Sequence, residues 1–202
     1  MSLAERILER REAFRGGTLR LEVRTVELPD GSTAVREVVE HPDAVCAAVL
    51  TPDRRLVLVR QFRSAAGKVM LEVPAGKLLP GESPEEGLKR ELLEEVGLVD
   101  GRPELLVRYH VAPGFCTEVM AVYLVRDAVL AQPCPEADEF LETVQVDLEE
   151  ALAMAREGRL EDAKTLVAIL AAEGRIRDGR GIVGPCGPQS RPGSRTEGGE
   201  AP

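Results

Sequence analysis

Hydrophobic and polar positions alternate along much of the chain, and this pattern predicts a protein of mixed α and β structure. Residues 19–28 and 33–40 flank the turn Pro29-Asp30-Gly31, which predicts an N-terminal β-hairpin. Apolar runs predict further strands near residues 44–50, 56–62, 70–73, 104–110, 119–126 and 142–147. Helices are expected near residues 3–13, 148–157 and 161–173.

A further helix is expected between Ser83 and Gly97, because both ends carry helix-terminal signals. Ser83 can cap the N-terminus, Pro84 suits the first turn, and Glu86 completes a capping box. Gly97 is suited to end the helix in the left-handed conformation. An apolar stripe that could anchor this helix to a core is formed by Leu88, Leu92 and Val96.

Three carboxylates share one face of this helix, since Glu91, Glu94 and Glu95 are spaced at i, i+3 and i+4. Their mutual repulsion would weaken the helix unless a cation lies among them. Mg²⁺ takes oxygen ligands from one or two such carboxylates together with substrate phosphates. Taken alone, paired glutamates on a helix more often form a solvated face.

The segment GKLLPGESPEEGLKRELLEEVGL, residues 76–98, has the order G-x5-E-x7-R-E-U-x-E-E-x-G-U, where U is a bulky aliphatic residue. It resembles the Nudix box, and the chain therefore resembles the Nudix hydrolases, which cleave a nucleoside diphosphate linked to another moiety. The resemblance implies an α+β fold, an α/β/α sandwich. Its mixed central sheet would be flanked by helices and extended by an N-terminal β-hairpin.

Segments outside the box resemble the ADP-ribose pyrophosphatase branch of this family. They are residues 36–42, 61–63, 72–76, 112–115 and 158–165. The resemblance implies Mg²⁺-dependent hydrolysis of ADP-ribose to AMP and ribose 5-phosphate. The GDP-mannose branch shares several of these features, so a GDP-mannose or broader nucleotide-sugar or FAD pyrophosphohydrolase is an alternative. A catalytically silent nucleotide-binding sensor is an alternative of another class.

The resemblance also implies roles for the residues of the box. Glu91 and Glu95 are the principal ligands of Mg²⁺, with Mn²⁺ possible, and they are helped by Glu94 and the carbonyl of Ala75. Arg90 orients the glutamates through an ion pair, with Glu82 as a candidate partner.

A general base is expected on the acidic segment of residues 135–139. By alignment with relatives, Glu139 is the first candidate and Glu136 the second. The alternative is a solvated acidic loop.

Substrate contacts are implied at residues that each have a structural alternative. Arg63 contacts phosphate or pairs with a surface carboxylate. Arg36 and Glu37 contact adenine in a partner subunit or form a cross-strand charge pair. Glu118 binds ribose or is solvated, and Pro113-Gly114 contacts substrate or only forms a tight turn. We expect structural roles for His41, His110, Lys164 and Thr165.

Composition limits the remaining classes of function. The 202 residues carry a net charge of −9, which argues against broad nucleic-acid binding. Without an apolar leader or a membrane-length apolar run, and with four cysteines that lack metal or disulfide spacing, a cytoplasmic protein is expected. We divide the chain into residues 1–43, which resemble a dimerisation and substrate-contacting unit of a homodimer, a hydrolase domain at 44–177, and a disordered tail at 178–202.

Overall fold

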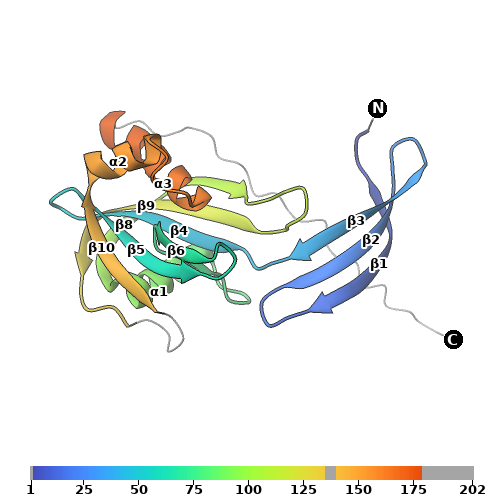
Figure 1. Ribbon diagram of the computed structural model, residues 1–202, viewed down its shortest axis with the longest axis horizontal. Coiled ribbons are helices and arrows are strands. Elements are labelled where there is room, and N and C mark those ends of the chain that lie inside the picture. The colour runs from blue at the N-terminus through green and yellow to red at the C-terminus, as the bar shows by residue number, and fades with distance from the viewer. Residues whose placement is uncertain (1, 135–139, 179–202) are drawn as a thin grey trace.

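The computed structural model describes residues 2–134 and 140–178, which form two β-sheets and three helices (Figure 1). The N-terminal sheet has the antiparallel order β1-β2-β3, with bounds Arg6–Arg15, Arg20–Glu27 and Thr33–Glu40. The central sheet has the order β10-β5-β4-β9-β8, with β6 paired to β5 and β7 paired to β4. Its strands are β4 (Ala44–Leu50), β5 (Arg55–Arg63), β6 (Lys68–Glu72), β7 (Ala75–Lys77), β8 (Leu98–His110), β9 (Val119–Leu130) and β10 (Leu141–Asp147).

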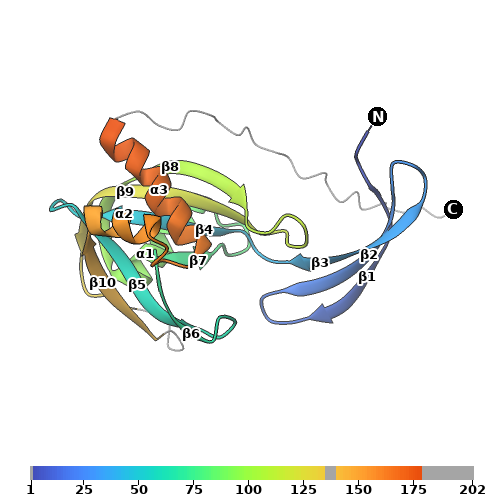
Figure 2. The same ribbon diagram turned by 45° about the horizontal axis from the view of Figure 1, so that its top comes forward.

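Helices cover both faces of the central sheet. β4 is buried along its whole length, and its side chains alternate between the two faces. Cys46 and Ala48 join the apolar cluster of α2 (Leu148–Arg156) and α3 (Ala163–Asp178), which lie side by side in Figure 2. The other face packs against α1 (Pro84–Val96). Because β4 runs parallel to β9 but antiparallel to β5, the sheet is mixed, and the predicted α/β/α sandwich is confirmed.

The signals predicted at the ends of α1 are confirmed. The Ser83 hydroxyl accepts a hydrogen bond from the Glu86 N–H at 3.3 Å, and the Glu86 carboxylate accepts one from the Ser83 N–H at 2.9 Å. Gly97 ends the helix with φ of 69°. The predicted apolar stripe is almost completely buried, with exposed fractions of 1–2% for Leu88, Leu92 and Val96. Burial of each leucine contributes about 1.5–3 kcal/mol, so the helix is fixed to the core.

The helix predicted over residues 3–13 is wrong, because this segment forms β1. β1 pairs with β2 from Arg6 opposite Glu27 to Arg15 opposite Arg20. The register shifts between Ile7 and Glu9 and again between Glu12 and Phe14, so apolar residues do not follow a strict period of two. The segment is rich in Glu and Arg, which favour helices, and its strand pattern is interrupted, so its composition indicates a helix. Pairing with the edge of β2 overrides that preference.

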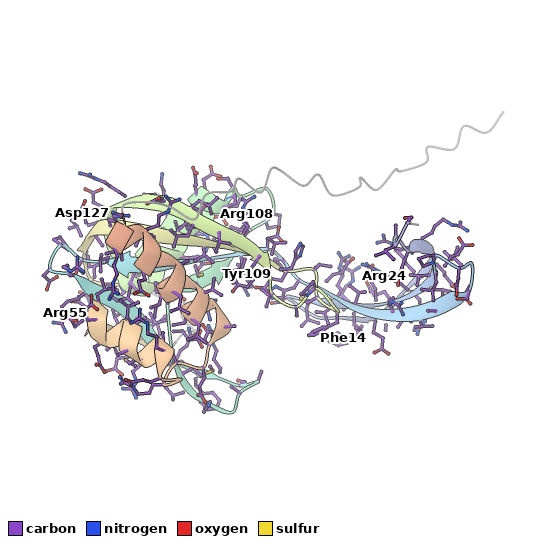
Figure 3. All side chains as sticks on the ribbon, turned by 90° about the horizontal axis from the view of Figure 1, so that it is seen from above. Phe14, Arg24, Arg55, Arg108, Tyr109 and Asp127 are labelled. Atoms are coloured by element: carbon purple, nitrogen blue, oxygen red, sulfur yellow. The ribbon has the colours of Figure 1, made fainter. Side chains whose placement is uncertain are left out.

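The N-terminal sheet extends away from the central sheet, with Phe14 and Arg24 far from Arg55 and Asp127 in Figure 3. Residues 41–43 join the two sheets, and an isolated bridge between Val39 and Cys116 makes a second connection. The boundary between residues 43 and 44 stays a prediction, and residues 179–202 of the predicted tail lie outside the described residues. None of the described helices has the length and apolar character needed to cross a membrane.

Replacement of Gly97 by alanine should destabilise the protein more than the same change at Gly158. Both glycines have positive φ, 69° and 73°, which costs alanine about 1–2 kcal/mol. A Cβ at position 97 would also lie 2.3 Å from the carbonyl oxygen of Ala131, whereas position 158 is open. Urea unfolding should therefore give a clearly larger loss for Gly97→Ala. Equal losses would show that the 131–134 segment yields without cost.

Candidate active site

A cavity of about 600 Å³ opens where α1, β7 and the β3–β4 junction meet. Among the sequence-predicted residues, those that line it are Arg63, Ala75, Arg90, Glu91, Glu95 and Glu118. The described lining also contains Lys77 and Lys164, so basic and acidic side chains face the same space. This mixture can bind a negatively charged ligand and a cation together, although the whole chain is acidic.

Arg90 links four parts of the site through its guanidinium group. Its Nε and Nη2 donate to the two carboxylate oxygens of Glu82, each at 2.9 Å, so the expected ion pair is present. Its Nη1 donates to Glu91 at 2.8 Å and to Glu94 at 3.3 Å, and its Nη2 reaches the carbonyl of Lys77 at 3.0 Å. Hydrogen bonds from Arg90, and one from the Leu79 N–H, hold the pKa of Glu82 below its usual range. The contacts with Glu82 and Glu91 raise the pKa of Arg90.

The backbone of β7 passes directly over the carboxylates of α1. The buried Glu95 accepts a hydrogen bond from the Ala75 N–H at 2.9 Å. A Cβ added to Gly76 would lie 1.7 Å from the carboxyl carbon of Glu91, so only glycine allows this approach. Glu91, Glu95 and the backbone at Ala75 are therefore held in one small volume.

This donor set fits Mg²⁺, which favours one or two carboxylates and leaves room for substrate phosphates. Within residues 2–134 and 140–178, no group of three His, Cys, Asp or Glu side chains meets the spacing of a metal site by itself. The three carboxylates are directed to different partners: Glu91 and Glu94 accept from Arg90, whereas Glu95 accepts from the Ala75 N–H. Glu94 is not among the described residues that line the cavity. The assignment of these ligands stays a prediction.

A buried ion-pair network forms the wall of the cavity opposite α1. Glu72 is only 1% exposed and accepts two hydrogen bonds from Arg63, at 2.9 and 2.7 Å, and one from Lys164. Burial alone would raise the pKa of Glu72, but these hydrogen bonds outweigh it and lower the pKa. Arg63 thus pairs with a buried carboxylate rather than the surface carboxylate considered above. Glu72 takes the Nε–H and one N–H of Nη2, so the N–H groups of Nη1 and the second N–H of Nη2 can serve other partners.

Glu118 and His41 lie together at the rim, on the loop between β8 and β9 and at the end of β3. The Nδ1 of His41 is 3.3 Å from a carboxylate oxygen of Glu118. Burial raises the pKa of Glu118, and the nearby His41 and Lys164 oppose that shift. The predicted contacts Pro113 and Gly114 lie on the same loop but are not among the described lining residues.

The remaining predicted residues are not placed at the cavity. Arg36 lies on the N-terminal sheet, where its Nε donates to Glu5 at 3.2 Å, and Glu37 is exposed beside it. The sequence left open adenine or a cross-strand charge pair for Arg36 and Glu37, and the structure pairs Arg36 with Glu5, the residue before β1. Glu136 and Glu139 lie outside the described residues.

Sequence reasoning missed several residues that line the cavity, among them Thr18, His41 and Lys164. Thr18 belongs to the turn between β1 and β2, which the wrong helix prediction concealed. His41 was assigned a structural role because no metal-like partner lies near it in sequence, and Lys164 because it was expected to pack the last helix. Their positions could have indicated a site, because His41 directly follows a strand and Lys164 lies in the first turn of a helix.

The chain is similar to known proteins over most of its length. The NUDIX domain model matches residues 33–168. The ADP-ribose pyrophosphatase of Bacillus subtilis (strain 168) is 36% identical over 170 residues, which are 83% of this chain and 92% of that protein. The methanol dehydrogenase activator of Bacillus methanolicus is 35% identical, over 82% of this chain and 90% of that protein.

Two further similarities bear on substrate and fold. The GDP-mannose pyrophosphatase of Yersinia enterocolitica is 29% identical over 72% of this chain and 83% of that protein. The crystal structure of an ADP compounds hydrolase superposes with a TM-score of 0.77 at 23% identity, covering 87% of this chain and 96% of that chain. At that identity the superposition supports the fold.

Replacement of Gly76 by alanine should weaken binding of Mg²⁺ by about 10- to 100-fold, because the new Cβ displaces the Glu91 carboxylate. Isothermal titration calorimetry with Mg²⁺ measures the change. Gly174→Ala is the matched control, since its Cβ would enter open space. Unchanged affinity in a folded Gly76→Ala protein would contradict the assignment of Glu91 as a ligand.

Proposed function

The chain belongs to the Nudix hydrolase family, and on this basis we propose that it hydrolyses the pyrophosphate bond of ADP-ribose to AMP and ribose 5-phosphate. The observation that carries the proposal is the arrangement of Glu91 and Glu95 beneath the Ala75-Gly76 backbone, beside a cavity with basic side chains. A cavity of about 600 Å³ is also within the usual range for a ligand of nucleotide size.

Mg²⁺, or Mn²⁺ in its place, would be held by Glu91, Glu95 and the carbonyl of Ala75, with Glu94 as a further candidate. When bound, the ion neutralises charge on the diphosphate and helps to align the attacking water. Arg90 keeps the glutamates in position, because its hydrogen bonds to Glu82 and Lys77 fix the guanidinium group. Arg90 lines the cavity, but its guanidinium group donates to three carboxylates and a backbone carbonyl, which favours an orienting role over substrate contact.

Charge on the diphosphate also needs fixed cations from the chain. Arg63 is suited to bind a non-bridging oxygen through Nη1, because Glu72 orients the guanidinium group through the other two nitrogens. Lys164 contributes a second positive charge on the same wall. Glu118 and His41 are suited to hydrogen-bond a ribose at the rim, where burial keeps the carboxyl in contact with few waters. Pro113 and Gly114 remain candidate contacts from the same loop.

The proposed general base is Glu139, with Glu136 as the second candidate. Both belong to the segment between β9 and β10. Leu141, at the start of β10 and two residues after Glu139 in the sequence, packs against the apolar cluster that contains residues of α1. A carboxylate carried on this connection is the means by which the chain could accept a proton from the attacking water.

We assign the N-terminal sheet to a homodimer interface that also reaches the substrate. β1 is exposed along all ten residues and presents an unpaired edge, and apolar side chains such as Ile7, Phe14 and Val35 are exposed on the sheet. In the dimer, Arg36 and Glu37 would contact the adenine bound by the partner subunit. Arg36 would then exchange its present ion pair with Glu5 for the base. The three described cysteines are free thiols, which supports a cytoplasmic location.

Two alternatives remain distinct from this proposal. A GDP-mannose or broader nucleotide-sugar or FAD pyrophosphohydrolase would use the same metal site with another base pocket, and the Yersinia relative favours that reading. A silent nucleotide sensor would have no need for the set Arg90, Glu91, Glu94 and Glu95. Arg90 hydrogen-bonds Glu91 and Glu94, and Glu95 accepts from the Ala75 N–H.

Replacement of Glu95 by glutamine should lower turnover of ADP-ribose by about a hundredfold or more, because a charged ligand is lost. The amide oxygen can still accept the Ala75 N–H, so the thermal midpoint should change little. Glu85→Gln, an exposed position on the same helix, is the matched control. Wild-type turnover in folded Glu95→Gln protein would reject the metal assignment.

A substrate panel tests the branch assignment. Phosphate release, coupled to a phosphatase, should be fastest with ADP-ribose among ADP-ribose, GDP-mannose and FAD, and should stop when Mg²⁺ is chelated. Faster cleavage of GDP-mannose would retain the mechanism and replace the substrate. Binding of ADP-ribose without any cleavage would support the sensor.

A further inference from the structure

The chain crosses from one strand neighbour to another at Val73 and Pro74, immediately before the proposed metal-binding backbone. β6 ends at Glu72 and pairs with β5, whereas β7 begins at Ala75 and pairs with β4. Val73 is fully buried, so its N–H needs a partner that neither strand ladder supplies. The hydroxyl of Thr165 in α3 accepts this hydrogen bond at 2.9 Å.

The Thr165 hydroxyl is itself fixed by the first turn of α3. It donates its proton to a carboxylate oxygen of Asp162, which also accepts the Thr165 N–H at 3.0 Å. Because the hydroxyl proton is used by Asp162, a lone pair is left to face Val73. Lys164, in the same turn, pairs with Asp162 at 3.0 Å and with Glu72. The first turn of α3 thus binds both the side chain of Glu72 and the backbone of Val73.

The backbone bound by Thr165 at Val73 lies two residues before Ala75, whose carbonyl belongs to the proposed metal site. The Pro74 carbonyl accepts from the Ala47 N–H at 3.1 Å, and the Ala75 N–H donates to Glu95 at 2.9 Å. These three hydrogen bonds therefore tie the crossing to three different elements, α3, β4 and α1. Only the bond from Thr165 comes from the helical layer opposite α1.

We propose that Thr165 is a positioning residue for the metal site. Its hydroxyl, held by Asp162, fixes the Val73-Pro74 crossing and so sets where the Ala75 carbonyl lies relative to the Glu95 carboxylate. Thr165 has an exposed fraction of 0% and cannot touch substrate, so it acts through the backbone alone. This inference rests on the proposed function, since it concerns the same cation.

Direct binding of Mn²⁺ to the full chain, followed by the electron paramagnetic resonance signal of the free ion, tests the inference. Thr165→Val keeps the shape of the side chain but removes the hydroxyl, and should weaken Mn²⁺ binding about tenfold. Thr165→Ser keeps the hydroxyl and should bind within about twofold of wild type. Ile169→Val removes a buried methylene from the same helix and should lower the thermal midpoint without changing Mn²⁺ affinity.

The outcomes separate this inference from the proposed function. Wild-type affinity in Thr165→Val overturns the positioning role, and so does an equal loss in Ile169→Val, which would show that helix stability alone is measured. If Thr165→Val does not fold, Asp162→Ala provides the test, because it frees the hydroxyl to rotate and should also weaken Mn²⁺ binding. Glu95→Gln is included in each titration. If wild type and Glu95→Gln bind Mn²⁺ equally, the metal site of the proposed function is wrong, whatever Thr165 does.

Discussion

Repulsion among the glutamates of α1 is the constraint on which the rest of the site depends. Glu91, Glu94 and Glu95 cannot share one helix face unless other groups offset their charge. Arg90 does so for the first two, and the Ala75 N–H does so for the third. The apolar stripe of the same helix is only 1–2% exposed, which keeps Glu91 and Glu95 facing the cavity. The charged and the apolar side of α1 therefore stabilise one orientation together.

The central sheet supplies what α1 lacks. Its β6–β7 crossing brings backbone groups over the glutamates, and the buried pair of Glu72 with Arg63 and Lys164 places positive charge on the opposite wall. Glu72 is retained as an anion in the interior because three hydrogen bonds from basic groups compensate its burial. The cavity thus lies between a negative helix and a positive wall, an arrangement that suits a metal ion and a diphosphate.

The sequence was most informative where signals are local. Caps and turn residues predicted α1 and the first hairpin, because each depends on neighbours within a few residues. The α/β/α layers were implied by the resemblance that the box carries. It failed for β1, where two register shifts hide the strand period and only pairing with β2 reveals it. His41, Lys164 and Thr165 were assigned to structure alone, since their partners lie far away in the chain and are set by tertiary packing.

The close approach of Gly76 to Glu91 also limits which substitutions this position can accept during evolution. Any side chain there would displace the Glu91 carboxylate, so glycine at this position is required by the proposed metal site. Thr18 and His41 line the same cavity from the β1–β2 turn and the end of β3, away from the glutamates of α1. New substrate preferences would therefore arise at the rim of the cavity, and a mutagenesis library aimed at specificity gains most by varying the rim and leaving the floor unchanged.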